Sequence, residues 1–199
     1  MSGIFITIGG IDGCGGTTHS RLLYEWLKKK FNKNVILTKE PTDGEIGKIL
    51  RKYLKDKKSN IRTDALLFAA DRIEHIENII KPALNQNMIV ISDRYIESSL
   101  AYQCAQGLSL NWILEINQGF IKPDLTIILD IEPEIALKRK DYIEDKFENI
   151  EFLKKVRLNY LEQAKLWNYK IINSNREIDI VHEEIIKEVE HIIKYKYSE

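Results

Sequence analysis

Short apolar runs alternate with longer segments of helical periodicity along the whole sequence, and this alternation restricts the chain to few architectures. Each apolar run is bounded by turn residues, which is typical of a strand buried on both faces. Because helices separate the strands, crossover connections must join them, and such connections produce parallel sheets. We therefore predict an α/β fold with a five-stranded parallel sheet flanked by helices. The predicted strands cover residues 4–8, 34–38, 88–92, 125–130 and 169–173, and the predicted helices cover 17–30, 45–55, 63–84, 97–106, 110–121, 149–167 and 177–197, with a further helix beginning at 134.

The length of 199 residues fits one domain, and we predict a single domain over residues 1–199. The charged segment 138–148 interrupts the helical pattern and is the candidate lid of that domain. Residues of the AVILMFWYC set make up 44% of the chain, which is enough to bury a core and argues against a disordered or fibrous protein.

Charge and cysteine content further restrict the class of protein to which the chain can belong. Thirty basic residues balance thirty acidic ones, whereas a protein that binds nucleic acid by neutralising phosphates normally has a basic excess. No apolar run approaches the roughly 18 residues needed to span a bilayer. Cys14 and Cys104 do not suggest a disulfide framework, and no Cys/His cluster suggests zinc. We expect a cytoplasmic protein with neither nucleic acid nor membrane as a partner.

A glycine-rich segment follows the first predicted strand and opens the first predicted helix. Gly10, Gly15 and Thr17 fall on the GxxxxGK[ST] pattern, in which backbone N–H groups surround phosphate oxygens at a helix N-terminus. Gly16 replaces the lysine of that pattern. The lysine places positive charge where negative charge moves during phosphoryl transfer, so its loss costs about 10²–10³ in rate. The segment predicts phosphate binding with impaired catalysis; tight strand–helix packing is the alternative interpretation of its glycines.

The predicted helix 63–84 carries a second candidate group. Phe68 and Arg72 lie four residues apart, flanked by Asp64 and His75, on the side away from the predicted core stripe. An aromatic ring beside a guanidinium can stack on a planar base and hydrogen-bond to it. Spacing alone favours the alternative, in which the helix packs on both sides and Arg72 pairs with a carboxylate. The predicted core stripe consists of Leu66, Ala69, Ala70, Ile73, Ile76 and Ile80.

A third group follows the predicted strand 88–92. Asp93 and Arg94 stand where ligand-binding residues gather in open parallel sheets, beyond a strand's carboxyl end. Asp93 there can hold Mg²⁺ through water, and Arg94 can clamp a phosphate. Ser99 and Tyr102 share a face of the next helix that can contact a sugar. A structural Asp–Arg ion pair is the alternative.

Six blocks in order make the sequence similar to the thymidylate kinase family, from about residue 3 to residue 173. The blocks are Gly10-Ile-Asp-Gly-Cys-Gly, Thr38-Lys-Glu-Pro41, Leu66-Leu-Phe-Ala-Ala-Asp-Arg72, Asp93-Arg-Tyr with Ser98-Ser99-x-Ala101-Tyr102-Gln103, Pro123-Asp-Leu-Thr-Ile-Ile-Leu-Asp130 with Pro133-Glu134 and Leu137-x-Arg139, and Phe152 with Arg157 and Tyr160-Leu161.

The resemblance implies a P-loop nucleoside monophosphate kinase fold, and transfer of the γ-phosphoryl group of ATP to dTMP with Mg²⁺. It also implies a homodimer. Residues for the ATP phosphates are then Gly10, Ile11, Asp12, Gly13, Cys14, Gly15, Gly16, Thr17 and Thr18, and residues for the metal are Thr17 and Asp93. Residues for dTMP are Asp12 at the sugar 3′-hydroxyl, Lys39, Phe68 and Arg72 at thymine, Arg94 at the phosphate, Ser99, and Tyr102 at the deoxyribose.

The family pattern also suggests catalytic groups. Arg94 and Arg139 would be catalytic, the latter because family members with glycine at the position of Gly13 supply an arginine from the lid. Lys140 and Lys146 are the other basic candidates in the lid.

Two departures from the family pattern stand out. Lys39 replaces an arginine and loses its bidentate fork, and Gly16 replaces the loop lysine. We interpret Gly16 as a substitution of a native lysine, a hypothesis that a glycine codon in the gene would contradict. A nucleotide-binding module without turnover and a kinase for another nucleoside monophosphate are the alternative functions.

Overall fold

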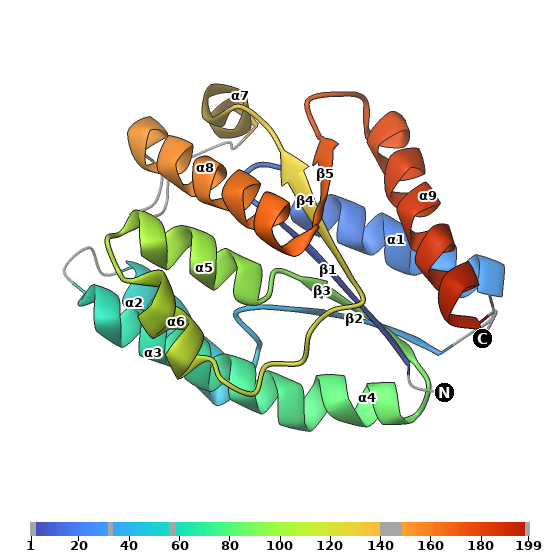
Figure 1. Cartoon of the computed structure of the whole chain (residues 1–199), viewed down its shortest axis with the longest axis horizontal. Coiled ribbons are helices and arrows are strands. Elements are labelled where there is room, and N and C mark those ends of the chain that lie inside the picture. The colour runs from blue at the N-terminus through green and yellow to red at the C-terminus, as the bar shows by residue number, and fades with distance from the viewer. Residues whose placement is uncertain (1–2, 32–33, 56–58, 140–148, 198–199) are drawn as a thin grey trace.

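The computed structural model describes residues 3–31, 34–55, 59–139 and 149–197. Within these ranges five parallel strands form one sheet in the order β2-β3-β1-β4-β5 (Figure 1). The central strand is β1, so both of its faces are covered and every residue of it is buried. The strands are β1 (Ile4–Gly10), β2 (Val35–Lys39), β3 (Ile89–Asp93), β4 (Leu125–Asp130) and β5 (Lys170–Asn173).

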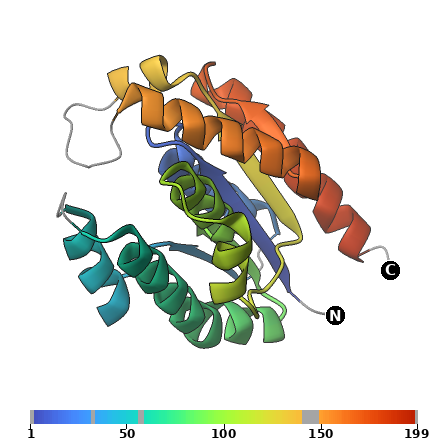
Figure 2. The ribbon, with the colours of Figure 1, turned by 60° about the vertical axis from the view of Figure 1, so that its left-hand side comes forward.

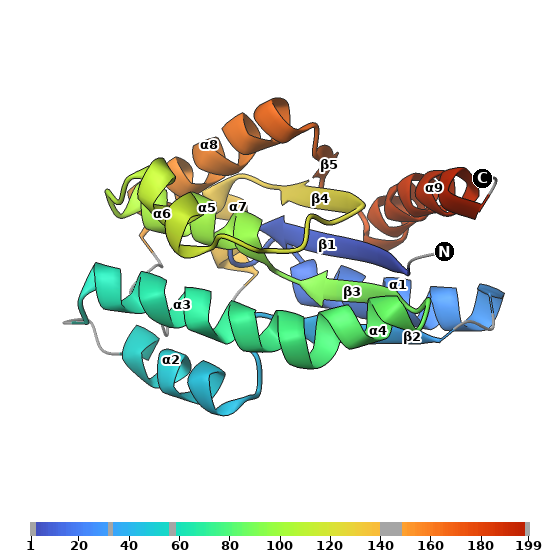
Figure 3. The ribbon, with the colours of Figure 1, turned by 60° about the horizontal axis from the view of Figure 1, so that its bottom comes forward.

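Helices cover both faces of the sheet, as the alternating pattern predicts. α1 (Gly16–Phe31) packs beside α9 (Ile178–Tyr197) on one face, and α5 (Ile96–Ala105) packs beside α8 (Ile150–Trp167) on the other (Figures 1 and 3). Figure 2 shows α5 lying between α8 and α3. The remaining helices are α2 (Glu45–Lys55), α3 (Ile61–His75), the π-helix η1 (Ile76–Ile80), α4 (Lys81–Asn85), α6 (Leu110–Ile116) and α7 (Pro133–Lys138).

The period-two alternation of β1 divides the core. Ile4 and Ile6 belong to the cluster that includes Leu23 of α1, whereas Phe5 belongs to the cluster that includes Ile96 of α5. None of the helices in the described ranges combines the length and the low charge that crossing a lipid bilayer requires.

The predicted core stripe of helix 63–84 is wrong at two positions. Leu66 and Ile73 are 50% and 55% exposed, while Ala69, Ile76 and Ile80 are buried as predicted. The segment is also not one regular helix, because a π-helical turn separates α3 from α4. α3 turns a polar face inward because its buried polar groups find partners there, as described below.

The register of the sheet aligns the carboxyl ends of its strands. Ile8 of β1 lies opposite Asp93 of β3, and Gly10 lies opposite Leu129 of β4. The segments that follow β1 and β3 therefore leave the sheet side by side, and the predicted ligand residues of both lie at one edge.

The turn between β2 and α2 lies at this carboxyl edge of the sheet and is fixed by hydrogen bonds. Thr42 donates its N–H and hydroxyl to the Asp71 carboxylate at 2.8 and 2.5 Å. Its carbonyl oxygen accepts a 2.6 Å hydrogen bond from Arg51 and would lie 2.0 Å from a Cβ placed on Gly47. α2 thus approaches the turn as closely as it does because position 47 carries no side chain.

We expect Gly47→Ala to lower the free energy of unfolding by about 1–3 kcal/mol, because the added methyl overpacks a turn that cannot move. Chemical denaturation measures this change. Lys52→Ala, at an exposed position of α2, is the matched control and should change little. Helix propensity alone predicts that Gly47→Ala stabilises the protein. That result would contradict the close approach of α2 to the turn at Thr42.

Candidate functional site

The glycine-rich segment forms a loop between β1 and α1 that lines a cavity of about 750 Å³. Gly13 and Gly15 have φ values of +83° and +94°, which favour glycine. A Cβ on Gly13 would also lie 2.3 Å from the Ala136 carbonyl oxygen. Because the loop leads directly into the N-terminus of α1, its N–H groups and the helix dipole favour an anion here.

Gly16 differs from these glycines. It is the first residue of α1, its φ is not positive, and a Cβ there would lie 3.0 Å from Asp93 Oδ1. The backbone therefore admits any L-residue at position 16, and only the flexible Asp93 carboxylate would have to shift. Nothing in the fold requires the glycine.

Two side chains whose oxygen atoms could bind a metal ion are in contact beside the loop. The Thr17 hydroxyl donates a 2.6 Å hydrogen bond to Asp93 Oδ2, so residues that follow β1 and end β3 are in contact. A hydroxyl and a carboxylate beside a phosphate cradle suit Mg²⁺, which prefers oxygen ligands and keeps several waters. The described residues contain no cluster of three or more His, Cys, Asp or Glu side chains around one point, so the chain would supply few ligands of its own.

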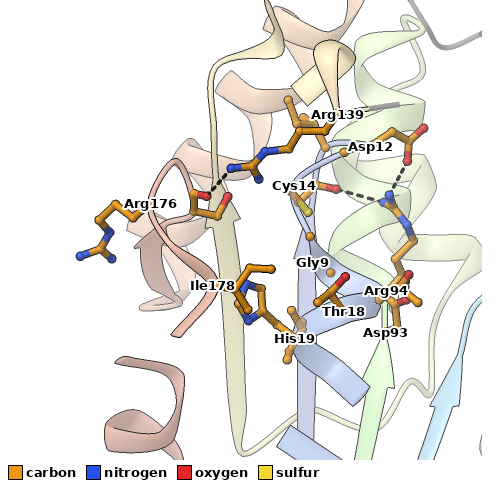
Figure 4. A pocket seen from close by; sticks show the side chains of 18 of the residues that line it. Gly9, Asp12, Cys14, Thr18, His19, Asp93, Arg94, Arg139, Arg176 and Ile178 are labelled. Atoms are coloured by element: carbon orange, nitrogen blue, oxygen red, sulfur yellow. Dashed lines mark hydrogen bonds and ion pairs between the residues drawn. The ribbon is translucent and has the colours of Figure 1, made fainter. Parts of the chain in front are cut away.

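Arg94 follows β3 with a φ of +71° and turns its guanidinium toward the loop. It pairs with the Asp12 carboxylate and donates a 3.0 Å hydrogen bond to the Gly10 carbonyl oxygen (Figure 4). Its guanidinium carbon lies 5.5 Å from the centre of the Tyr102 ring. The Tyr102 hydroxyl in turn accepts the Asp12 N–H at 3.0 Å. Sequence-predicted residues of the first and third groups are thus brought into one network.

A smaller cavity of about 150 Å³ begins at this network. Asp12 and Arg94 line both cavities, and Phe68, Ser99 and Tyr102 line only the smaller one. Gln103 also lines it and is only 1% exposed, and its Oε1 has no partner among the described residues. Gln103 belongs to one of the family blocks but has no predicted role there, because only the tertiary structure shows that its amide is buried with an unused acceptor.

Arg72 lies beside this cavity but does not line it. Its guanidinium donates to Glu40 Oε2 at 2.6 and 3.0 Å and to the Ser99 hydroxyl at 2.9 Å, and it also bonds Asn117. The carboxylate pair that spacing alone favoured is therefore present. A contact of Arg72 with a base remains a prediction, supported by the position of its partner Ser99 in the cavity wall.

Lys39 is not brought to the Phe68 cavity. Its ammonium lies 3.2 Å from the Asp43 carboxylate, and it lines a separate cavity of about 550 Å³ that reaches Thr17 and Asp93. Lys39 therefore shares a cavity wall with Thr17 and Asp93 and not with Phe68.

Arg139 reaches the large cavity from the end of α7. It donates a 3.0 Å hydrogen bond to the Ser174 carbonyl oxygen and faces the glycine loop (Figure 4). Lys140, Lys146 and the rest of the predicted lid beyond Arg139 lie outside the described residues. Other lining residues were not predicted from the sequence. His19 lies in α1 behind the loop, and no local pattern marks the segment that joins β5 to α9, which contributes Ser174, Arg176, Glu177 and Ile178.

Comparison with known proteins agrees with this geometry. A family model described as Thymidylate kinase matches residues 8–185. A Pyrococcus horikoshii protein named "Probable thymidylate kinase" is 42% identical over 201 residues, covering 96% of this chain and 98% of its own. A Thermococcus onnurineus protein of the same name is 45% identical, with coverages of 94% and 98%. A crystal structure of thymidylate kinase from Ehrlichia chaffeensis superposes with a TM-score of 0.79 at 34% identity, covering 95% of this chain and all of that one.

Glu97 is a buried carboxyl directly beneath the glycine loop. A Cβ on Gly9 would lie 3.0 Å from Glu97 Oε1, and neither carboxyl oxygen has a hydrogen-bond partner among the described residues. Burial raises the pKa of Glu97 to about 7. The nearby backbone N–H groups of Glu97 itself and of Tyr95 and the Arg72 charge oppose this shift, while the Glu40 charge adds to it. The carboxyl is therefore protonated in mildly acidic solution.

The raised pKa of Glu97 makes the free energy of unfolding depend on pH in a defined direction. The folded protein holds a proton that the unfolded chain releases above its ordinary pKa of 4.5, so stability is lost as the pH rises from about 4.5 to 7. We expect the unfolding free energy of the parent protein, relative to that of Glu97→Gln, to fall by about 3 kcal/mol between pH 4 and pH 7.5. Urea denaturation at a series of pH values measures it.

The comparison with Glu97→Gln is needed because His19 acts in the opposite direction. Burial lowers the pKa of His19 to about 4, so its contribution to stability rises with pH from about 4 to its ordinary value of 6.5. That contribution is common to both proteins and cancels in the difference. Parallel stability curves for the two proteins would show that Glu97 is ionised in the fold.

Proposed function

Because the chain belongs to the thymidylate kinase family, we propose that it transfers the γ-phosphoryl group of ATP to dTMP, with dTDP and ADP as products. The observation that carries the proposal is that Asp12 and Arg94 line both the phosphate-loop cavity and the smaller Phe68 cavity. Two nucleotides bound in these cavities would have their phosphates close together beside Arg94. In-line phosphoryl transfer requires this proximity.

The donor nucleotide would occupy the larger cavity. Backbone N–H groups of residues 10–18 and the start of α1 would bind its phosphates. Thr17 and Asp93 would hold Mg²⁺, which when bound neutralises charge on the phosphate oxygens. Arg139, on the opposite wall, would add a positive charge at the transferred group.

The acceptor would occupy the smaller cavity. Phe68 would stack on thymine, while Ser99, Gln103 and Arg72 supply polar groups around the base edge. Tyr102 would pack against the deoxyribose and Asp12 would accept a hydrogen bond from its 3′-hydroxyl. Arg94 is already aligned by Asp12 and Gly10, so little side-chain entropy is lost when it binds the dTMP phosphate.

Turnover would be slow in this chain because no ammonium stands at position 16. Arg139 and Mg²⁺ leave room for residual activity, since phosphoryl transfer relies on positioning and charge. The same absence favours a second candidate function, a nucleotide-binding module without turnover. We also propose a cytoplasmic location, in keeping with the free thiols of Cys14 and Cys104.

We expect Gly16→Lys to raise the turnover of Mg²⁺-ATP and dTMP by about 10²–10³, measured as ADP release. Gly16→Met is the matched control, because it restores a side chain of similar length without the charge. Gly16→Met should leave turnover within a few-fold of the parent, which separates the charge from the stiffening of the loop. Replacing dTMP by dUMP or dCMP in the same assay identifies the preferred acceptor.

Each outcome assigns a function. High turnover by the parent protein would contradict the proposed impairment by Gly16 and would support the kinase function. If the parent and Gly16→Lys are equally inactive while calorimetry still detects dTMP binding, the binding module is the function. A preference for another acceptor over dTMP would replace thymidylate as the substrate.

We further propose a homodimer formed through the outer surfaces of α2 and α3. These adjacent helices expose Ile49 and Tyr53 on α2 and Leu66 and Ile73 on α3. Leu66 and Ile73 are two helical turns apart and so lie on one face. Large apolar side chains on neighbouring helices are typical of a surface that another chain covers.

We expect Ile73→Asp to convert the dimer to a monomer in sedimentation velocity experiments, since a charge in the interface core is left without a partner. Leu158→Asp, at a 58% exposed apolar position of α8, should leave the dimer intact. A monomeric parent protein, or dissociation by both substitutions, would contradict the proposed surface.

A further inference from the structure

A cavity of about 550 Å³ lies at the opposite edge of the sheet from the phosphate loop, where β4 and β5 begin. Its walls come from α5, α6, the chain before β4, the end of α8 and α9. None of its lining residues lines the cavities assigned to ATP and dTMP. The volume falls within the range that small-molecule sites occupy, roughly 300–1,000 Å³.

The helix α5 separates this cavity from the acceptor site. Ile96 and Leu100 of α5 line the new cavity, whereas Ser99 and Tyr102 line the acceptor cavity. Leu100 is buried, so the α5 wall is part of the rigid core.

The walls favour a flat apolar ligand. Leu100, Leu114 and Phe120 supply aliphatic and aromatic surface. Trp167 and Tyr169 also line the cavity, with ring centres 5.8 Å apart and planes inclined by 43°. Two half-buried rings at this spacing offer stacking surface to a third ring.

Two polar groups of the cavity, the Trp167 indole N–H and the Tyr169 hydroxyl, can donate hydrogen bonds to a ligand. Neither Trp167 nor Tyr169 makes a hydrogen bond through its side chain to any residue in the described ranges. Burial raises the pKa of Tyr169 above its ordinary value, so its hydroxyl keeps its proton. An indole N–H and a phenol O–H directed at a ligand would bind an acceptor oxygen.

The charge at the rim is positive. Asp124 is paired with Lys196 at 2.7 Å, and Lys170 with Glu188 at 3.1 Å. Lys122 is exposed and forms no ion pair with the part of the chain that the structure describes. Its ammonium is therefore the uncompensated charge among the lining residues, and an anionic group on the ligand would complement it.

We propose that this cavity binds a flat, mainly apolar monoanion, of the class of aromatic carboxylates and sulfonates. The apolar body would lie between Leu114 and the Trp167–Tyr169 pair, and the anionic group would lie at Lys122. The site is independent of the kinase activity proposed above, because it shares no lining residue with the nucleotide cavities.

A pair of fluorescent probes tests the proposal. 1-Anilinonaphthalene-8-sulfonate is an aromatic monoanion, and N-phenyl-1-naphthylamine is the same molecule without the sulfonate. The full chain is titrated with each probe in saturating ADP and dTMP, which occupy the nucleotide cavities without turnover. We expect the sulfonate to bind about fivefold more tightly than the neutral probe, as expected for one charge-assisted contact.

Matched substitutions then locate the probe. Lys122→Gln should remove the advantage of the sulfonate, while Lys165→Gln, at an exposed lysine of α8 outside the cavity, should keep it. Leu114→Trp fills the cavity and should weaken both probes at least about tenfold. Leu158→Trp, on the exposed face of α8, should weaken neither.

Thermal unfolding establishes that each variant is folded before its binding is interpreted. Should Leu114→Trp fail to fold, the lysine pair and the probe pair still decide the question. Failure of the sulfonate to bind in saturating ADP and dTMP, equal affinity for both probes, or equal effects of Lys122→Gln and Lys165→Gln would overturn the proposal.

Discussion

The pairing of β1 with β3 is the constraint on which the whole site depends. Ile8 lies opposite Asp93, so the glycine loop and the Asp93–Arg94 segment leave the sheet together. This register allows Thr17 to reach Asp93 and Arg94 to reach Asp12 and the Gly10 carbonyl. A shift by one residue would turn each side chain of one strand to the other face and would separate these groups.

The inward polar face of α3 supports the side of the site that contains the Phe68 cavity. Arg72, Glu40, His75 and Ser99 are all buried, and their side chains bond one another in one network. Loss of one partner of such a buried ion pair costs about 3–5 kcal/mol, because the other charge is left without compensation. The network therefore ties the turn after β2, helix α3 and helix α5 into one rigid wall beside Phe68 and Gln103.

Carboxyl groups occupy the space beside two glycines of the phosphate loop. Glu97 lies where a side chain on Gly9 would project, and Asp93 lies where one on Gly16 would begin. Glu97 is buried, whereas Asp93 is half-buried and its carboxylate is held only by the Thr17 hydroxyl among the described residues, so the two positions differ in tolerance. The fold thus accommodates the glycine at position 16 without depending on it, whereas a side chain at position 9 would have to displace the buried Glu97.

The sequence by itself determined the α/β class, the parallel sheet and the two segments that form the nucleotide site, because alternating periodicities and glycine spacing are local properties of the chain. Through the family resemblance it also predicted Phe68, Arg94 and Tyr102 as neighbours of one ligand, and these three side chains line one cavity. Only the tertiary structure decided that Leu66 and Ile73 face outward and that Lys39 lines a different cavity. It also decided that the carboxylate partner of Arg72 is Glu40. The buried Gln103 Oε1 and Glu97 carboxyl oxygens, which have no hydrogen-bond partner among the described residues, are likewise a property of the tertiary structure. These properties depend on which elements pack together, and a periodic pattern shows which residues share a face but not what that face meets.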